Sequence, residues 1–95
     1  MTAEPSTAIV KTDRFEAIRL VVPAGQEIRR HAVPGHITLH CLEGHVELGL
    51  DGTAIALRAN DWTYLDGGAA HSLKGLADSL LLLTILFAPG DAGPR

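Results

Sequence analysis

Hydrophobic residues occur along this chain in short runs, some alternating with polar residues and some wholly aliphatic, and glycine, proline and aspartate separate the runs. Runs of this length that are rich in Val, Ile, Leu and Thr and bounded by turn-forming residues are typical of β-strands. The expected strands are residues 15–22, 37–42, 45–50, 53–57, 62–65, 71–73 and 79–87. The pattern therefore predicts an antiparallel, all-β domain.

The turns between these runs can also be predicted. The Asp-Gly pair at 51–52 favours a two-residue hairpin, because such loops need positive φ angles that Asp and Gly tolerate. A tight turn at the Glu-Gly pair 43–44 would place His40 opposite Glu47 as a cross-strand pair. A helix over 77–87 stays open as an alternative, since leucine also favours helices.

Two of the expected strands are apolar on both faces. In 37–42, Ile37, Leu39 and Cys41 share one face, and Leu42 lies on the other. Residues 80–83 are all leucine and have no polar face. Because a two-layer sheet would expose one side of these strands to water, we expect a second subunit to cover that side. The pattern predicts a homodimer.

The length of the chain limits it to one domain. A chain of 95 residues cannot support two hydrophobic cores, so we expect a single domain over 1–95, with its core at about 15–87 and frayed tails at 1–6 and 89–95. The net charge is −3 and no basic cluster is present. Nucleic-acid binding is therefore disfavoured, because it requires Lys and Arg side chains that neutralise phosphates.

Cys41 is the only cysteine, so no intrachain disulfide can form, which fits a reducing compartment. We expect this thiol to face the apolar interior. The chain begins without the features of a secretory signal. Its apolar runs are far shorter than the roughly 20 residues that a membrane span needs. The prediction is a cytoplasmic protein that does not associate with membranes.

Two segments of the chain carry a histidine among turn-forming glycines. Residues 25–44 read GQEIRRHAVPGHITLHCLEG, and residues 60–71 read NDWTYLDGGAAH. Together they resemble the paired motifs of the cupin family. The resemblance implies a double-stranded β-helix, or jelly-roll, barrel with a cavity between its sheets.

The resemblance also implies positions for the residues of the site. By the spacing of the cupin motifs, His31 and His71 stand at two metal-ligand positions. Val33 stands where the family has a further histidine, and Ile37 stands where it has a glutamate. The implied cavity is lined by these four residues but lacks half of the usual ligand set.

A cupin-like catalytic metal would use three histidines and one carboxylate, and two imidazoles hold a divalent ion only weakly. The expected cofactor is none, or a weakly bound divalent Fe, Mn, Zn or Ni. The leading hypothesis is therefore a module that binds or senses a small molecule in a cavity lined by His31 and His71. Trp62 and Tyr64 are expected near the mouth of this cavity.

The alternative is a metal-dependent enzyme of the dioxygenase or isomerase type. His36 could fold back across the Pro-Gly turn at 34–35 and join His31 and His71 as a third ligand. His36 and His40 cannot both bind one ion, because four residues of strand span about 13 Å. A structural dimer with a filled core is a third possibility, and His45 is expected to be solvated. Whether the protein is an enzyme stays open.

Overall fold

The computed structural model describes residues 6–87, which form strands and contain no helix, and therefore no helix that could cross a membrane. The all-β prediction is confirmed. The strands are β1 (Thr7–Lys11), β2 (Phe15–Val22), β3 (Glu27–His31), β4 (His36–Glu43), β5 (His45–Leu50), β6 (Thr53–Arg58), β7 (Trp62–Leu65), β8 (His71–Gly75) and β9 (Ser79–Leu86).

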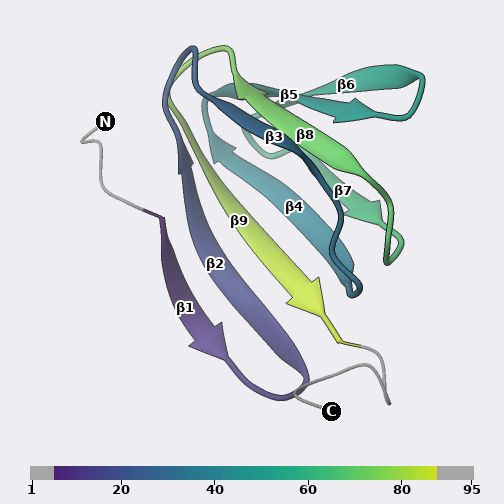
Figure 1. The fold of residues 1–95 in the computed structure, drawn as a ribbon. Helices are drawn as coiled ribbons and strands as arrows, with labels where there is room; N and C mark the ends of the chain where they lie inside the picture. The colour runs from purple at the N-terminus through teal and green to yellow at the C-terminus, as the bar shows by residue number, and fades with distance from the viewer. Residues whose placement is uncertain (1–5, 88–95) are drawn as a thin grey trace.

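The strands form two antiparallel sheets that pack face to face (Figure 1). One sheet has the order β1-β2-β9-β4-β7, and the other has the order β3-β8-β5-β6. From β2 onward, each connection except the β5–β6 hairpin carries the chain from one sheet to the other. This alternation between layers is the winding of a jelly roll, so the predicted architecture is confirmed.

Two observed strands, β1 and β3, are absent from the prediction. All of β1 is exposed, and β3 has the sequence EIRRH with four of its five residues exposed. Each lies at the edge of a sheet, where a strand needs only one neighbour and no continuous apolar face. The folded region therefore begins before residue 15, and the Ser6 hydroxyl accepts a hydrogen bond from the backbone N–H of Val21. The rest of the two expected tails lies outside the described residues.

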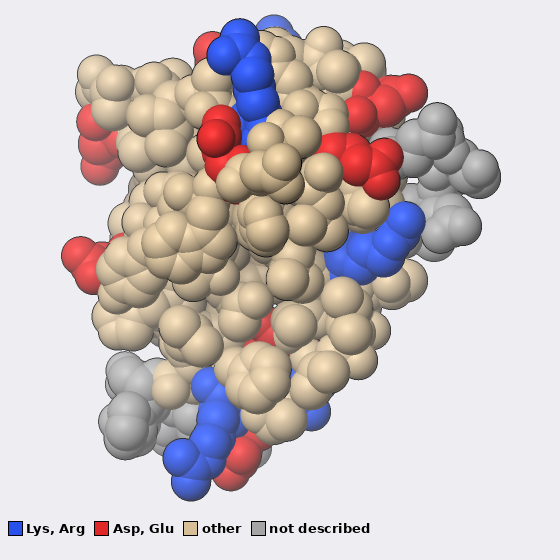
Figure 2. Space-filling view, turned by 180° about the vertical axis from the view of Figure 1, so that it is seen from behind, with Lys and Arg blue, Asp and Glu red and all other residues tan. Residues whose placement is uncertain are grey.

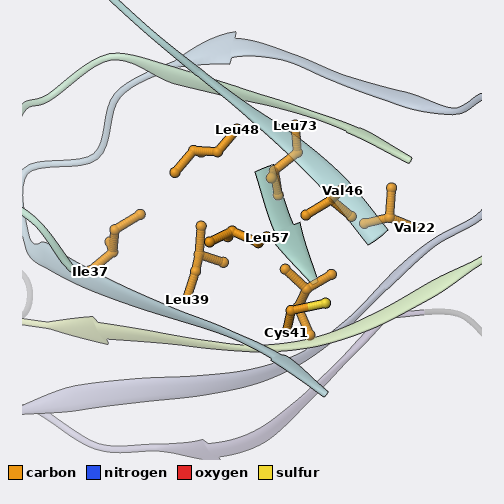
Figure 3. Packing of buried hydrophobic residues seen from close by; sticks show 9 residues of the cluster. Val22, Ile37, Leu39, Cys41, Val46, Leu48, Leu57 and Leu73 are labelled. Atoms are coloured by element: carbon orange, nitrogen blue, oxygen red, sulfur yellow. The ribbon is translucent and has the colours of Figure 1, made fainter. Parts of the chain in front are cut away.

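The core lies between the sheets and is built from aliphatic side chains and one thiol (Figure 3). Its fully or almost fully buried members are Val22, Ile37, Leu39, Cys41 and Leu81 from the five-stranded sheet and Val46, Leu48, Leu57 and Leu73 from the four-stranded sheet. Each such aliphatic side chain contributes roughly 1.5–3 kcal/mol on burial. The inward orientation predicted for Cys41 is confirmed, since its exposed fraction is 0%.

Gly44 carries the chain from β4 in one sheet directly into β5 in the other. Its φ angle is +92°, a conformation that L side chains rarely adopt. A Cβ atom at this position would also overlap the Ser79 hydroxyl and the Asp78 carbonyl oxygen. Both the backbone angle and the packing therefore require glycine here.

This change of sheet corrects the expected pairing of His40 with Glu47. Because β4 and β5 belong to different sheets, the turn between them does not form a hairpin. His40 lies beside Leu82 of β9 and Trp62 of β7 instead. Buried and partly exposed residues alternate along β4, and the neighbours of His40, Leu39 and Cys41, are buried. His40 therefore projects from the outer face of the five-stranded sheet.

The outer face of the five-stranded sheet is mostly apolar. We call its apolar part the outer apolar face and define it by Phe15, Val21, Leu42, Trp62, Tyr64, Leu80, Leu82 and Leu86. Polar residues on the same side of the sheet are Arg19, His36, Thr38, His40 and Thr84. The exposed fractions are 59% for Trp62, 45% for Tyr64 and 39% for Leu42. Figure 2, which shows the molecule from behind relative to Figure 1, has mostly uncharged side chains over the centre of this side. A large apolar surface of this kind is typical of an interaction site.

Candidate functional site

Two histidines from distant parts of the chain meet across one strand pair. His31 of β3 and His71 of β8 are direct partners in the antiparallel ladder. Their ring centroids lie 4.5 Å apart, and the ring planes are tilted by 55°. The fold therefore brings together the two histidines that the sequence singled out.

An irregularity in β3 turns His31 toward the cavity. In a regular strand, residues three positions apart face opposite sides of the sheet. The register of β3 against β8 shifts between Ile28 and His31, and both of these residues line the same cavity. This bulge-like shift re-aims the imidazole, which is a common role for such irregularities.

The cavity lies between the two sheets and has a volume of about 100 Å³. Leu20, Ile37, Leu39 and Leu83 line it from the five-stranded sheet, and Ile28, His31, His71 and Leu73 line it from the four-stranded sheet. Its wall therefore combines six aliphatic side chains with two imidazoles. His71 is 5% exposed, whereas His31 is exposed, so the cavity is open to solvent on the β3 side.

The backbone fixes the proton on each imidazole. His31 Nδ1 lies 2.9 Å from the Arg29 carbonyl oxygen, and His71 Nδ1 lies 2.9 Å from the Ala69 carbonyl oxygen. Because a carbonyl oxygen can only accept, both Nδ1 atoms carry a hydrogen. In the uncharged ring, Nε2 is then a bare acceptor. Within residues 6–87, neither Nε2 atom has a hydrogen-bond partner.

The two aliphatic residues at the other motif positions differ in their placement. Ile37 lines the cavity as expected from the resemblance. Val33 does not line it; this side chain packs against the core, and its carbonyl oxygen accepts a hydrogen bond from the Gly68 N–H. The expectation that Val33 contacts a ligand in this cavity is therefore corrected.

Trp62 and Tyr64 lie on the other side of the sheet from the cavity. Both belong to β7. The alternate residues of this strand, Thr63 and Leu65, pair with Leu39 and Ile37, which face inward. The pleat therefore points both aromatic rings outward, and their expected position near the mouth is corrected. The Tyr64 hydroxyl donates to Asp66 at 3.0 Å, and its pKa is raised by burial and by this carboxylate.

His36 also faces outward and cannot join the histidine pair. Its neighbour Ile37 points into the cavity, so the strand places His36 on the opposite face. His36 Nδ1 accepts a hydrogen bond of 2.9 Å from the Gly67 N–H, and its ring lies 5.9 Å from that of Tyr64. The proposed third metal ligand is therefore wrong, because β4 would have to turn over to supply it.

The remaining residues do not complete a metal site. Within residues 6–87, no group of three or more His, Cys, Asp or Glu side chains lies together in a way that could hold a metal ion. His31 and His71 supply two imidazole nitrogens, and their neighbours in the cavity are aliphatic. These residues do not fit the usual four-ligand set of a resident catalytic metal.

His45 is another departure from expectation. Its Nε2 atom is buried and has no hydrogen-bond partner among the described residues, so the ring is not simply solvated. The fully buried Ser79 hydroxyl accepts a hydrogen bond from the His45 N–H at 2.9 Å and donates to the Ala77 carbonyl oxygen at 2.7 Å. Sequence reasoning missed this contact because it joins positions 34 residues apart.

Sequence reasoning also missed several cavity residues, namely Leu20, Ile28, Leu39, Leu73 and Leu83. The alternation of residues along β4 and β9 indicates which side chains point inward. It does not distinguish the side chains that border a cavity from those that fill the core. That distinction depends on how the two sheets pack.

No protein-family profile and no curated protein sequence matches this chain. Solved structures do match. A cupin superfamily protein from Desulfitobacterium hafniense has a TM-score of 0.84 at 19% sequence identity. The alignment covers 87% of this chain and 76% of the other chain. An RmlC-like cupin from Desulfovibrio desulfuricans has a TM-score of 0.78 at 23% sequence identity. The alignment covers 85% of this chain and 79% of the other chain.

A third match is an uncharacterized conserved protein with a double-stranded β-helix domain from Klebsiella pneumoniae. Its TM-score is 0.78 at 25% identity, and the alignment covers 98% of this chain and 84% of the other. These similarities agree with the two interleaved sheets described above.

Proposed function

We propose, on the premise that the chain has the cupin fold, that this protein binds a small molecule in the cavity between its two sheets. The observation that supports the proposal is the wall of six aliphatic side chains with two oriented imidazoles, His31 and His71, whose Nε2 atoms have no partner within residues 6–87. Apolar walls with a few fixed polar groups are the usual composition of ligand pockets. The role would be binding or sensing.

The size of the cavity limits its ligand. Its volume is about 100 Å³, whereas pockets for drug-sized molecules have roughly 300–1,000 Å³. An engineered apolar cavity of about 150 Å³ in another protein holds benzene. The ligand proposed here is therefore a molecule of a few heavy atoms, or a larger molecule of which one end enters the cavity.

Filling the cavity tests this proposal. Ile28 lines the cavity from β3, and Ile28→Phe would fill the cavity with a larger, aromatic side chain. We expect small apolar fragments to raise the melting temperature of the wild type, because they bind only the folded state, and to have no effect on the variant. Ile55→Phe is the matched control, since Ile55 lies on β6 and is 36% exposed. Equal responses of the two variants would contradict the proposal.

A metal-dependent enzyme is the second candidate, and one observation favours it. Metal-binding histidines usually donate the N–H of their second ring nitrogen to a carbonyl or carboxylate oxygen. His31 and His71 both do so through Nδ1. The cavity nevertheless offers two nitrogens and no carboxylate. We expect elemental analysis of protein purified without a histidine tag to find well under one equivalent of Fe, Mn, Zn or Ni. A stoichiometric amount of one of these metals would favour the metal-dependent enzyme over the binding module.

We also propose that the protein works as a homodimer formed through the outer apolar face. The five strands have eight residues each in β2, β4 and β9, five in β1 and four in β7. At about 3.3 Å per residue and about 4.8 Å between strands, they cover roughly 500 Å² before side-chain relief is counted. A standard interface uses about 800 Å² per partner. The side chains that project from the face add to this area, so the face approaches the size that one stable contact needs.

A further inference from the structure

We infer that the natural ligand of the cavity carries two adjacent hydrogen-bond donors, as a vicinal diol does, on a short apolar body. The inference rests on the proposed function and specifies its ligand. It follows from the fixed orientation of the imidazoles of His31 and His71.

The polarity of the cavity wall comes from its two imidazoles. The backbone carbonyl oxygens of Arg29 and Ala69 hold the two Nδ1 hydrogens, so each uncharged ring presents only an acceptor at Nε2. The other six lining side chains are aliphatic and carry neither donor nor acceptor. The side chains of the wall thus offer two acceptors and no donor.

A ligand without hydrogen-bond donors would leave both Nε2 atoms desolvated and unpaired. A ketone or a carboxylate would bring its own lone pairs against the two Nε2 atoms, and both sides would lose water without gaining a hydrogen bond. A hydroxyl donates to one Nε2 atom and leaves the other unmatched. Since the centroids of the two rings are 4.5 Å apart, two neighbouring hydroxyls on one ligand are suited to satisfy both.

The side of the cavity opposite the imidazoles is apolar. Leu20, Leu83 and Ile37 border the cavity on the sheet opposite the imidazoles. A ligand whose head bonds to His31 and His71 therefore directs its remaining atoms toward aliphatic side chains. The volume of about 100 Å³ limits these atoms to a short chain.

A matched series of four-carbon compounds tests the inference. 1,2-Butanediol has two donors, 1-butanol has one, and 2,3-butanedione has none. By calorimetric titration, we expect the affinity to fall by about fivefold at each step, because a net hydrogen bond is worth about 1 kcal/mol. Butanoate serves as an anionic member of the series, and we expect it to bind more weakly than the diol.

Variants locate the effect at the histidines. His71→Leu removes one acceptor and puts an apolar side chain of similar size in its place. The preference for the diol over 1-butanol should therefore disappear. His31→Leu, at the more exposed position, provides the same test if His71→Leu does not fold. His40→Leu is the control, since His40 lies on the outer face of β4 and should keep the full preference.

Nuclear magnetic resonance gives a readout that is independent of affinity. Long-range nitrogen–proton spectra distinguish the ring tautomers, and we expect His31 and His71 to be protonated at Nδ1. Their Nε2 signals should move when the diol is added. Protonation at Nε2 in the free protein, or binding of the dione or butanoate that equals binding of the diol, would overturn the inference. If none of the four compounds bound, the proposed function itself would fail.

Discussion

The thiol of Cys41 shows how strongly the surroundings of one side chain control its chemistry. Burial raises its pKa, and the nearby negative charge of Asp61 raises it further. A hydrogen bond with the Glu43 backbone acts in the opposite direction but does not outweigh these two effects. The thiol is therefore held in its protonated form, which is the unreactive one.

This raised pKa predicts slow modification and a loss of stability at alkaline pH. An unfolded thiol ionises near a pKa of about 8.5. As the pH rises above that value, the unfolded state loses the Cys41 proton before the folded state does, so the free energy of unfolding decreases. Urea unfolding at neutral and alkaline pH should show this decrease, and Cys41→Ala should reduce it. Rapid labelling of native Cys41 by a thiol reagent would show that the thiol is accessible.

At Gly44, a positive φ angle and a close contact act together, and substitution can separate them. Gly44→Ala should lower the free energy of unfolding by about 2 kcal/mol or more, because of the strained backbone and the overlap with Ser79. Gly52 is the matched control, since its φ is +74° and no atom lies within 4 Å of a Cβ there. Gly52→Ala should cost only about 1 kcal/mol. Equal losses in urea unfolding would mean that the contact contributes nothing.

Among the strands, those that bury a face could be predicted from the sequence, and those at the edges could not. Alternating or aliphatic runs located β2, β4, β5, β6, β7, β8 and β9. The Asp-Gly hairpin at 51–52 is confirmed, because Leu50 pairs with Thr53 across it. The charged β3 has no such pattern, since its position depends on its pairing with β8.

The site was predictable to a smaller extent than the strands. The expectation that His31 and His71 line one cavity followed from a resemblance between motifs, because no local pattern relates two histidines on separate strands. Their pairing across β3 and β8 was not predicted. The outward positions of His36, Trp62 and Tyr64 follow from the pleat once β4 and β7 are paired. The cavity itself could not be predicted, because a void reflects the fit between two sheets.

At the scale of the whole molecule, the outer apolar face predicts self-association. Leu42→Glu should dissociate the proposed dimer, because a charge without a partner at a desolvated interface costs several kcal/mol. Ile55→Glu is the matched control, since Ile55 has a similar exposed fraction, 36% against 39%, but lies on the four-stranded sheet. Sedimentation should find dimers of the wild type and of Ile55→Glu and monomers of Leu42→Glu. A wild-type monomer at micromolar concentration would contradict the proposed dimer.

The position of β3 has a consequence for the kinetics of binding. This strand is held by a single ladder, to β8, and the ladder is irregular between Ile28 and His31. Opening it breaks the hydrogen bonds of one edge, whereas separating the two sheets would expose the whole core. Local openings of this kind need far less free energy than global unfolding. For the proposed ligand, we therefore expect substitutions in β3 to change the rate of release from the cavity without altering the core.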